Sequence, residues 1–458
     1  MLDAMSRAAL NLSLSSGVAS LEADAWNRLA FNGLRGDLDS RRESAFASDS
    51  LLQASSDKPL LSQRNQILAQ NAAESGELAL RDLRREADSN SQRCVDAAES
   101  SSEQTGFNPF VSHAFLSALE DSGCVGSGTG WTPATLIAER DGALAGAAPS
   151  YLKTHSQGEY VFDHAWADAY ERAGGRYYPK LQVSVPFTPV TGPRLFARTQ
   201  ETRAALASGL VSAARQIGAS SVHVTFPHEA EARALEAQGW LLRIGEQFQF
   251  RNDGYRDYDD FLSTLASRKR KALKRERREA LTQGIEIEWL SGAAITEAHW
   301  DAFFDFYMDT GARKWGRPYL NRAFFSLLGE RLGESVLLVT ARRGRRLIAG
   351  ALNLIGSDAL YGRYWGAVED VSFLHFELCY HQAIDFALAR GLARVEAGAQ
   401  GEHKLARGYR PTPTYSAHYI LDPGLRRAVA DYLVRERAHM LAAIAADDES
   451  APFRKSPQ

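Results

Sequence analysis

Tyr361-Gly-Arg-Tyr-Trp-Gly366 opens the most informative stretch of the chain, which closes with Gln400-Gly-Glu-His-Lys-Leu-Ala-Arg-Gly-Tyr-Arg-Pro411. Between them, apolar residues recur with helical period over 374–390, and Gly391 and Gly398 bound a short apolar run that holds one acid. This pattern predicts a strand, a helix, a second strand over 393–398 and a glycine-flanked basic turn. Because α/β folds place polar side chains where strands meet loops, we expect functional residues at these junctions.

The composition is that of an ordinary folded protein. The chain has 458 residues, of which 45% are hydrophobic and 10% aromatic, so it can form two or three domains with buried cores. Its net charge of −3 excludes a globally basic nucleic-acid binder, and we expect no DNA partner. A local basic patch remains compatible with this charge.

Cysteine and histidine spacing bear on redox state and metals. Cys94, Cys124 and Cys379 are odd in number and far apart, which predicts a reducing, cytoplasmic environment. The eleven histidines include no pair with metal-ligand spacing, so we expect no metal site. No run approaches the ~20 apolar residues of a membrane span, and the N-terminus lacks a signal-peptide pattern. We expect no transmembrane segment and leave peripheral membrane contact open.

The chain divides by composition and pattern into five parts. Residues 1–32 form an N-terminal element of a first module, and 33–106 are a polar, low-complexity insert that we expect to be flexible. The first module continues over 107–254, a second module spans 255–447, and 448–458 form a tail. Both modules read as hairpin, strand, helix, strand, helix and strand, which indicates a duplicated α/β unit.

Several short sequence motifs resemble those of the FemAB-like peptidoglycan biosynthesis/recognition family within the GNAT acyltransferase superfamily. They are Asn108-Pro-Phe-Val-Ser-His113, His155-Ser-Gln-Gly-Glu-Tyr-Val-Phe-Asp163, Tyr178-Pro-Lys-Leu-Gln182, Lys314-Trp-Gly-Arg-Pro-Tyr319 and the opening stretch itself. The resemblance implies tandem GNAT-like modules with mixed central sheets flanked by helices. It also implies an N-acyltransferase that moves an acyl or aminoacyl group to an amine, with acyl-CoA or aminoacyl-tRNA as co-substrate and no tightly bound cofactor.

One expected motif is missing. The resemblance to GNAT enzymes that use acetyl-CoA implies an Arg/Gln-x-x-Gly-x-Gly/Ala loop at a helix N-terminus. The backbone N–H groups of that loop hold the pyrophosphate. No such loop follows the strand predicted over 348–355. This absence disfavours acetyl-CoA and leaves aminoacyl-tRNA or another acyl carrier as the donor.

A basic segment opens the second module, in a helix predicted over 258–282. Its candidate phosphate-binding residues are Arg268, Lys269, Arg270 and Lys271. Like charges three and four residues apart destabilise a helix, and a phosphate-bearing partner such as tRNA, a nucleotide or a lipid head group relieves that repulsion. The alternative is a solvated face on which Glu276 and Glu279 are the partners.

Candidate catalytic residues cluster in the opening stretch. Glu377 in the first turn of the helix and Glu396 in the short strand are candidate bases, and Tyr361 and Tyr409 could assist the oxyanion or the leaving group. Lys404 and Arg407 follow Glu396 on a turn and allow two interpretations. They could form an ion-pair network with Glu396, because an acid in a central strand is costly to bury unpaired, or they could bind a phosphate or carboxylate of the substrate while Glu396 orients an amine. Cys379 borders the core stripe and reads as a packed thiol. The remaining substrate-binding candidates here are Arg363, His375 and His403.

The first module contributes weaker candidates. His155 and Lys180 belong to a dense group of polar and aromatic residues that could form an acceptor-binding wall or pack at the interface between modules. Trp315, within one of the family-like motifs, is a further substrate-binding candidate.

The function expected from these features is acyl or aminoacyl transfer to an amine. The acceptor is a small molecule or a muropeptide, such as a peptidoglycan precursor or an amino-acid derivative, and tRNA is a candidate partner. The alternative is a non-catalytic module that recognises a peptidoglycan precursor or peptide, which the missing pyrophosphate loop favours.

Overall fold

The computed structural model describes residues 9–31, 106–282, 284–314, 318–398 and 401–454. Trp315 and all but the last residue of the predicted insert, 33–106, lie outside the described residues. We use "first half" for the described residues up to 254 and "second half" for those that follow.

A small antiparallel sheet belongs to the first half, with strand order β1-β3-β4-β7. Asp141 and Gly142 join β3 to β4 with φ of 53° and 73°, the left-handed backbone that a tight hairpin turn requires. The strands are β1 (Asn11–Ser15), β3 (Thr135–Arg140), β4 (Ala143–Ala148) and β7 (Phe196–Ala197).

The main sheet has eleven strands and runs through both halves, in the order β10-β11-β12-β13-β14-β9-β15-β8-β6-β5-β2. The first half supplies β2 (Trp131–Pro133), β5 (Ser150–Lys153), β6 (Lys180–Val183), β8 (Ser221–Thr225) and β9 (Leu241–Arg251). The second half supplies β10 (Ile285–Leu290), β11 (Val336–Arg343), β12 (Arg346–Ile355), β13 (Ala359–Ala367), β14 (Arg394–Glu396) and β15 (Arg410–Ile420).

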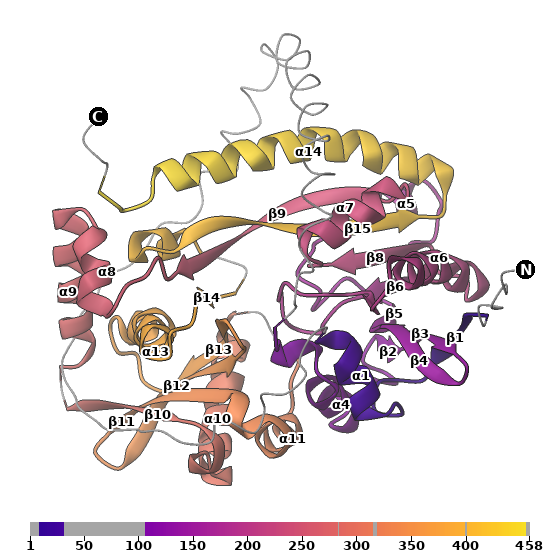
Figure 1. The fold of residues 1–458 in the computed structure, drawn as a ribbon. Helices are drawn as coiled ribbons and strands as arrows, with labels where there is room; N and C mark the ends of the chain where they lie inside the picture. The colour runs from indigo at the N-terminus through magenta and orange to yellow at the C-terminus, as the bar shows by residue number, and fades with distance from the viewer. Residues whose placement is uncertain (1–8, 32–105, 283, 315–317, 399–400, 455–458) are drawn as a thin grey trace, which may run out of the picture. The chain divides into compact units, whose positions relative to one another are not determined.

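The two halves exchange their last strands. β9 of the first half pairs with β14 of the second, and β15 of the second half pairs with β8 of the first. β9 and β15 also pair with each other from Arg410↔Gln249 to His418↔Leu241, and Figure 1 shows the two long strands side by side. β15 begins at Arg410, although Pro411 and Pro413 lack the N–H that a ladder uses.

The duplicated α/β order is confirmed by the strand pairings. Each half has an antiparallel hairpin, β3–β4 or β11–β12, with one more antiparallel strand beside it, β1 or β10. Each then has a parallel pair, β6–β8 or β13–β14, joined across a helix because parallel neighbours need a crossover connection. The predicted fold class, α/β with mixed sheets flanked by helices, is correct.

Helices cover the sheets as Figure 1 shows, and the 27-residue α14 lies along β9 and β15. In the first half they are α1 (Ala23–Ala30), the 3-10 turn η1 (Pro109–Val111), α4 (His113–Asp121), α5 (His164–Arg172), α6 (Gln200–Gln216) and α7 (Glu229–Ala237). In the second half they include α8 (Tyr258–Thr264), α9 (Ser267–Ala280), the 3-10 turn η2 (Gly292–Ala294), α10 (Glu297–Lys314), α11 (Arg322–Leu332), the 3-10 turn η3 (Gly333–Ser335) and α14 (Pro423–Glu449).

The single helix predicted over 258–282 is wrong. The backbone leaves the helix at Leu265, where φ is −83° and ψ is 153°, and α9 starts afresh at Ser267. Leu265 is fully buried and forms a β-bridge with Phe453, and the N–H of Ala266 donates to the Pro452 carbonyl. A contact with the far end of the chain therefore divides a segment whose local pattern is helical throughout.

A buried histidine pair joins β8 to β15. His223 and His418 are cross-strand partners with their Nδ1 atoms 2.7 Å apart, and the outer nitrogens contact Ser221 and Ser416. Burial lowers the pKa of His223 to about 3, with the nearby Lys180 adding to the effect. Burial, and then His223, lowers the pKa of His418 as well. Both rings are consequently neutral in the folded protein.

This pair predicts a loss of stability in mild acid. Below about pH 6.5 the unfolded chain takes up protons at these histidines, whereas the folded chain does not. Because the unfolded state then binds more protons, the free energy of unfolding falls as the pH drops, by up to about 1.4 kcal/mol per pH unit for each histidine. Urea unfolding between about pH 7 and about pH 5, above the usual carboxyl range, measures this slope.

The double variant His223→Asn/His418→Asn should have a shallower slope, and His439→Gln on the exposed side of α14 should keep the wild-type slope. Part of the slope should survive in the double variant, because burial also lowers the pKa of His228 to about 4. Stability that does not change with pH over this range would contradict the prediction.

Candidate functional site

The candidate pocket lies where two parallel strands separate. β13 pairs with β14 only from Ala359 to Tyr361, and no strand among the described residues pairs with its following residues on that side. A pocket of about 90 Å³ occupies this region. The residues that line it include Asn353, Gly362, Arg363, His375, Cys379 and Tyr380.

A β-bulge aims Arg363 at this region. Leu352 pairs with Tyr364 and Asn353 with Gly362, so Arg363 is the extra residue between the two pairs. Its side chain is buried; Nε donates to Thr188 Oγ1 at 2.5 Å and Nη2 lies 3.4 Å from Glu396 Oε2. Thr188 follows β6, so both halves contribute to the arrangement around Arg363.

Asn353 brings an unused hydrogen-bond acceptor to the pocket. Its amide nitrogen donates to the carbonyls of Leu337 and Ala351, which assigns the oxygen to the opposite side. The residue is fully buried, and Oδ1 has no hydrogen-bond partner among the described residues. A Cβ placed on Gly362 would come within 3.1 Å of this oxygen, so the glycine leaves room beside it. The oxygen is suited to receive a ligand N–H.

A π-helical turn forms the wall opposite the strands. The predicted helix 374–390 consists of α12 (Leu374–Phe376), the π turn η4 (Glu377–His381) and α13 (Gln382–Ala389). Such turns occur frequently at functional sites because they displace side chains from helical register. Here the turn carries Cys379 and Tyr380, both of which line the pocket, so the thiol predicted to be packed in the core borders this space. The Tyr380 hydroxyl is 2.8 Å from His403 Nε2.

The carboxylates predicted as bases are held in ion pairs. Glu377 is fully buried, accepts hydrogen bonds from Arg277 and Gln382, and is not among the lining residues. Glu396 is 1% exposed and contacts both Arg363 and Arg394. Both carboxylates therefore have cationic partners in this structure.

The two tyrosines predicted as catalytic are buried beside the pocket without lining it. The hydroxyl of Tyr361 accepts from Arg394 at 3.4 Å, and that of Tyr409 has no partner within the described part of the chain. Burial raises the pKa of both hydroxyls. Both phenols are therefore neutral.

The predicted basic turn is a 3-10 helix, η5 (Glu402–Arg407), and its two cations, Lys404 and Arg407, have different partners. Lys404 Nζ donates to the Gly398 carbonyl at 2.8 Å, and no described carboxylate lies within 4 Å of it. Burial, and then the neighbouring Arg363, lowers the pKa of Lys404 to about 7. Arg407 instead forms an ion pair with Glu276 of α9 and stacks 3.5 Å from the Phe376 ring centroid.

Glu276 connects the basic helix to the pocket wall. Its carboxylate accepts two hydrogen bonds from Arg407 and lies 2.8 Å from His381 Nε2. His381 in turn contacts the Tyr258 hydroxyl. Glu276, expected to be a solvated partner of the basic helix, is thus largely buried and points toward the pocket wall. Glu279 forms an ion pair with Arg275 of the same helix.

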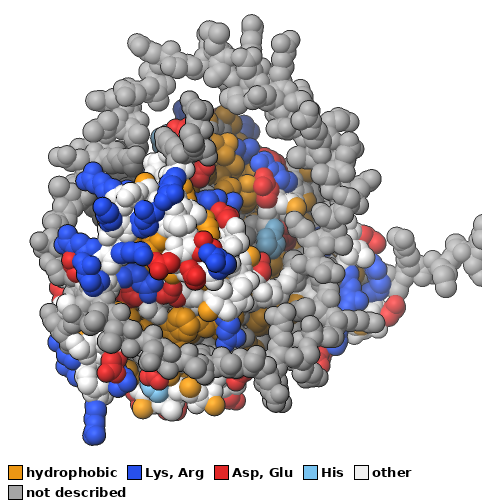
Figure 2. Space-filling view, turned by 60° about the vertical axis from the view of Figure 1, so that its left-hand side comes forward, with side chains coloured by type: hydrophobic (Ala, Val, Ile, Leu, Met, Phe, Trp, Pro, Cys, Tyr) orange, Lys and Arg blue, Asp and Glu red, His pale blue; other side chains and the backbone are white. Residues whose placement is uncertain are grey.

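The outward face of α9 is cationic. Figure 2 shows Lys and Arg side chains gathered on the face that carries this helix, with acidic side chains beside them. Arg268, Lys269 and Lys271 are exposed, Arg270 is half-buried, and no described acid lies within 4 Å of any of the four. The helix start adds to this charge, because its first turn has no acid and no side-chain cap.

The first-half candidates lie elsewhere. Lys180 is buried in an ion network with Glu159 and Asp163, and His155 contacts the Thr129 carbonyl. Neither lines the pocket, and Trp315 lies outside the described residues. The described residues include no group of three or more His, Cys, Asp or Glu arranged to hold a metal ion.

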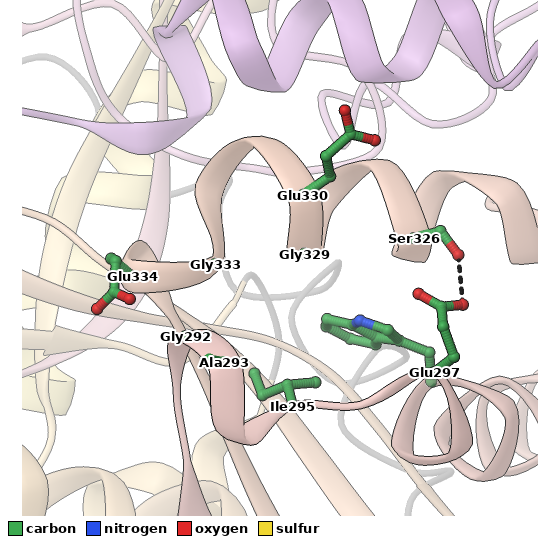
Figure 3. Close-up of a pocket in the computed structure, with 10 residues that line it drawn as sticks. Gly292, Ala293, Ile295, Glu297, Ser326, Gly329, Glu330, Gly333 and Glu334 are labelled. Atoms are coloured by element: carbon green, nitrogen blue, oxygen red, sulfur yellow. Dashed lines mark hydrogen bonds between the residues drawn. The ribbon is translucent and has the colours of Figure 1, made fainter.

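A larger hollow, of about 400 Å³, lies between η2, the start of α10 and α11. Figure 3 shows that Ser326 and Glu297 face each other and bond across it, while Glu330 points away. The other lining side chains are mostly small or apolar, and three of the lining residues are glycines. The polar groups do not converge on one point, so we do not place the functional site there.

The sequence from 92 to 455 matches the FemAB-like family, described as peptidoglycan biosynthesis/recognition. The chain therefore belongs to this family, as its sequence motifs predicted. A comparison with curated proteins gives no match. No helix in the described ranges is long and apolar enough to cross a membrane.

Solved structures that match this chain include three at 10–13% sequence identity. FemX is 13% identical over 66% of this chain and 91% of its own, with a TM-score of 0.43. L-PGS from Bacillus licheniformis is 10% identical over 72% and 98%, with a TM-score of 0.44. A tandem GNAT protein from the clavulanic acid biosynthesis pathway is 11% identical over 71% and 92%, with a TM-score of 0.40.

The Glu276 ion pair yields a test of how α9 is held. Replacing Glu276 with Ala leaves the largely buried Arg407 without a carboxylate and should lower the free energy of unfolding by about 3 kcal/mol. Urea denaturation measures this loss. Glu279→Ala, which removes a partner of the exposed Arg275, should leave the midpoint unchanged. Equal midpoints for the two variants would show that Glu276 does not hold the helix.

Proposed function

We propose that the protein transfers an acyl or aminoacyl group to an amine, and that the reaction takes place in the pocket beside β13. The observation that carries the proposal is the buried, unpartnered Asn353 oxygen beside Gly362. Membership of the FemAB-like family supports a role in peptidoglycan biosynthesis or recognition, with a peptidoglycan precursor or amino-acid derivative as acceptor. A cytoplasmic location is part of this proposal.

The backbone offers a second binding feature. Beyond Tyr361, no strand in the described part of the chain pairs with β13 on the side facing away from β12, although the Gly362 carbonyl accepts from Arg363. The other peptide groups of this edge can pair with an extended ligand. The amide of a donor or of a peptide acceptor suits such an edge. Asn353 Oδ1 would then accept an N–H from the ligand and fix its position along the strand.

Cationic groups supply the complementary charge. Lys404 is buried beside the pocket without lining it, and the described residues place no carboxylate within 4 Å of its Nζ. If the ligand displaces its bond to the Gly398 carbonyl, it can hold an anionic group or a carbonyl oxygen that gains charge during transfer. The exposed cations of α9 can bind phosphates of the donor, either acyl-CoA or aminoacyl-tRNA. In the reaction the amine nitrogen bonds to the acyl carbon and loses a proton, while the bond to the donor oxygen or sulfur breaks and the leaving group gains a proton.

The second candidate function is recognition without catalysis. It is favoured by one observation: Glu377 and Glu396 are both ion-paired, which leaves neither poised as a free base. Under this reading the pocket binds a peptidoglycan precursor or peptide through the same β13 edge and Asn353, and no bond is made.

Binding and turnover separate the two functions. Purified protein is mixed with acetyl-CoA, alanyl-tRNA and a nucleotide-linked muropeptide, thermal stabilisation is recorded, and each stabilising probe is tested for product by mass spectrometry. Transfer is expected with a donor and an amine acceptor together. Stabilisation by the muropeptide without product under any pairing favours recognition.

Asn353→Leu tests the pocket. Loss of a buried hydrogen bond to the ligand costs about 1–3 kcal/mol, so kcat/KM or affinity should fall by roughly tenfold to a hundredfold. Ser326→Ala in the hollow of Figure 3 is the matched control and should leave both unchanged. The reverse pattern would move the site to that hollow.

Lys404 predicts how binding depends on pH. Because its pKa lies at about 7, its charge is present below that pH and is lost as the pH rises through it. The affinity for an anionic probe that stabilises the protein should therefore weaken above pH 7. In Lys404→Arg the guanidinium stays charged, so the affinity should hold to higher pH. An unchanged profile in this variant would exclude Lys404 as the anion-binding group.

A further inference from the structure

We propose that Tyr380 and His403 form a proton pathway that links the pocket to solvent and accepts the proton released by the amine. This inference rests on the proposed function, because it concerns the same pocket and the same reaction. It assigns a catalytic role to Tyr380, one of the residues that line the pocket.

The Tyr380–His403 pair leads from a buried side chain to an exposed one. Tyr380 is 4% exposed and lines the pocket from the π turn, whereas His403 lies at the surface on η5. The hydroxyl and Nε2 are 2.8 Å apart, within ordinary hydrogen-bonding distance, and the two rings meet edge-on at 5.5 Å. Among the described residues that line the pocket, Tyr380 thus bonds directly to an exposed titratable group.

The chemistry of the two groups sets the direction of the bond. Burial and the neighbouring Cys379 raise the pKa of the Tyr380 hydroxyl, while Arg407 opposes the shift, so the phenol stays protonated at neutral pH. A neutral phenol donates and a neutral imidazole accepts through its unprotonated nitrogen. His403 is therefore expected to accept at Nε2 and to carry its own proton on Nδ1.

The proton step balances without any further reagent. As the amine nitrogen bonds to the acyl carbon, its proton passes to the Tyr380 oxygen while the Tyr380 proton moves to His403 Nε2. The imidazolium then releases its Nδ1 proton to water. The leaving oxygen or sulfur of the donor takes one proton from water as its bond to the acyl carbon breaks, so the number of protons in solution does not change. The pair returns to its initial state through a tautomer change of the exposed ring.

Neighbouring groups hold the two rings in place. Arg407, fixed by Glu276, donates from Nη1 to the His403 carbonyl at 2.7 Å and stacks on Phe376. Phe376 lies 5.6 Å from the His403 ring centroid and 6.1 Å from that of Tyr380. The other titratable groups that face the pair are Cys379, His375, Tyr409 and Arg407.

The first test needs no substrate. Nitrogen-15 NMR of the full-length protein records the tautomer and titration of His403, assigned with His403→Gln. The wild type is expected to hold neutral His403 as the Nδ1–H tautomer. In Tyr380→Phe the lost hydroxyl bond should raise its titration midpoint, because that bond stabilises the neutral ring. An Nε2–H tautomer, or an unchanged midpoint, overturns the pathway whether or not the protein transfers acyl groups.

The second test uses turnover with acetyl-CoA or alanyl-tRNA and the muropeptide. Tyr380→Phe should lower kcat roughly a hundredfold or more with KM little changed, since general acid–base catalysis contributes about 10²–10⁴-fold. His403→Gln should give a smaller loss and remove a pH-dependent limb, whereas His439→Gln should match the wild type. Full activity in Tyr380→Phe overturns the pathway. Absence of turnover with every donor overturns the proposed transfer and the pathway's part in it, while the NMR result judges the bond separately.

Discussion

The pairing of β9 with β15 is the constraint on which the rest of the structure depends. Nine residue pairs join a strand from the middle of the chain to a strand near its end, and each strand also completes the sheet of the other half. α14 packs along both strands. Because of this exchange, β14 is paired with β9 of the first half, and Thr188 of the first half contacts Arg363 on β13.

Local chemistry explains what the sequence predicts well. Asp141 and Gly142 make a hairpin from their own backbone preferences, and the helical period of 374–390 and the short strand around Glu396 need no distant partner to be recognised. The family assignment follows from motifs that lie in such segments. The exchange itself leaves no local trace, because either half could close its sheet with its own last strand.

The site is predictable only in part for the same reason. Arg363 lies in a motif that the sequence already singles out, and it lines the pocket. Asn353 lies inside a buried apolar strand, and only the structure reveals that its oxygen has no partner among the described residues. Glu377 stands where a base would be expected, yet Arg277 reaches it from a helix a hundred residues earlier. Leu265 breaks a helix through its bridge to Phe453, which no local pattern reveals. Ion pairs and orphaned polar atoms are properties of the packed chain.

The strand exchange also sets the order in which the protein can be completed as it is made. When the ribosome has produced the first half, β8 still has an open edge and β9 lacks both of its final neighbours. That edge is closed only after residues 410–420 emerge, so contacts of high sequence separation complete the main sheet. An unpaired edge is a template for wrong strand pairing, and β8 keeps this edge unpaired while the chain grows from Thr225 to Arg410.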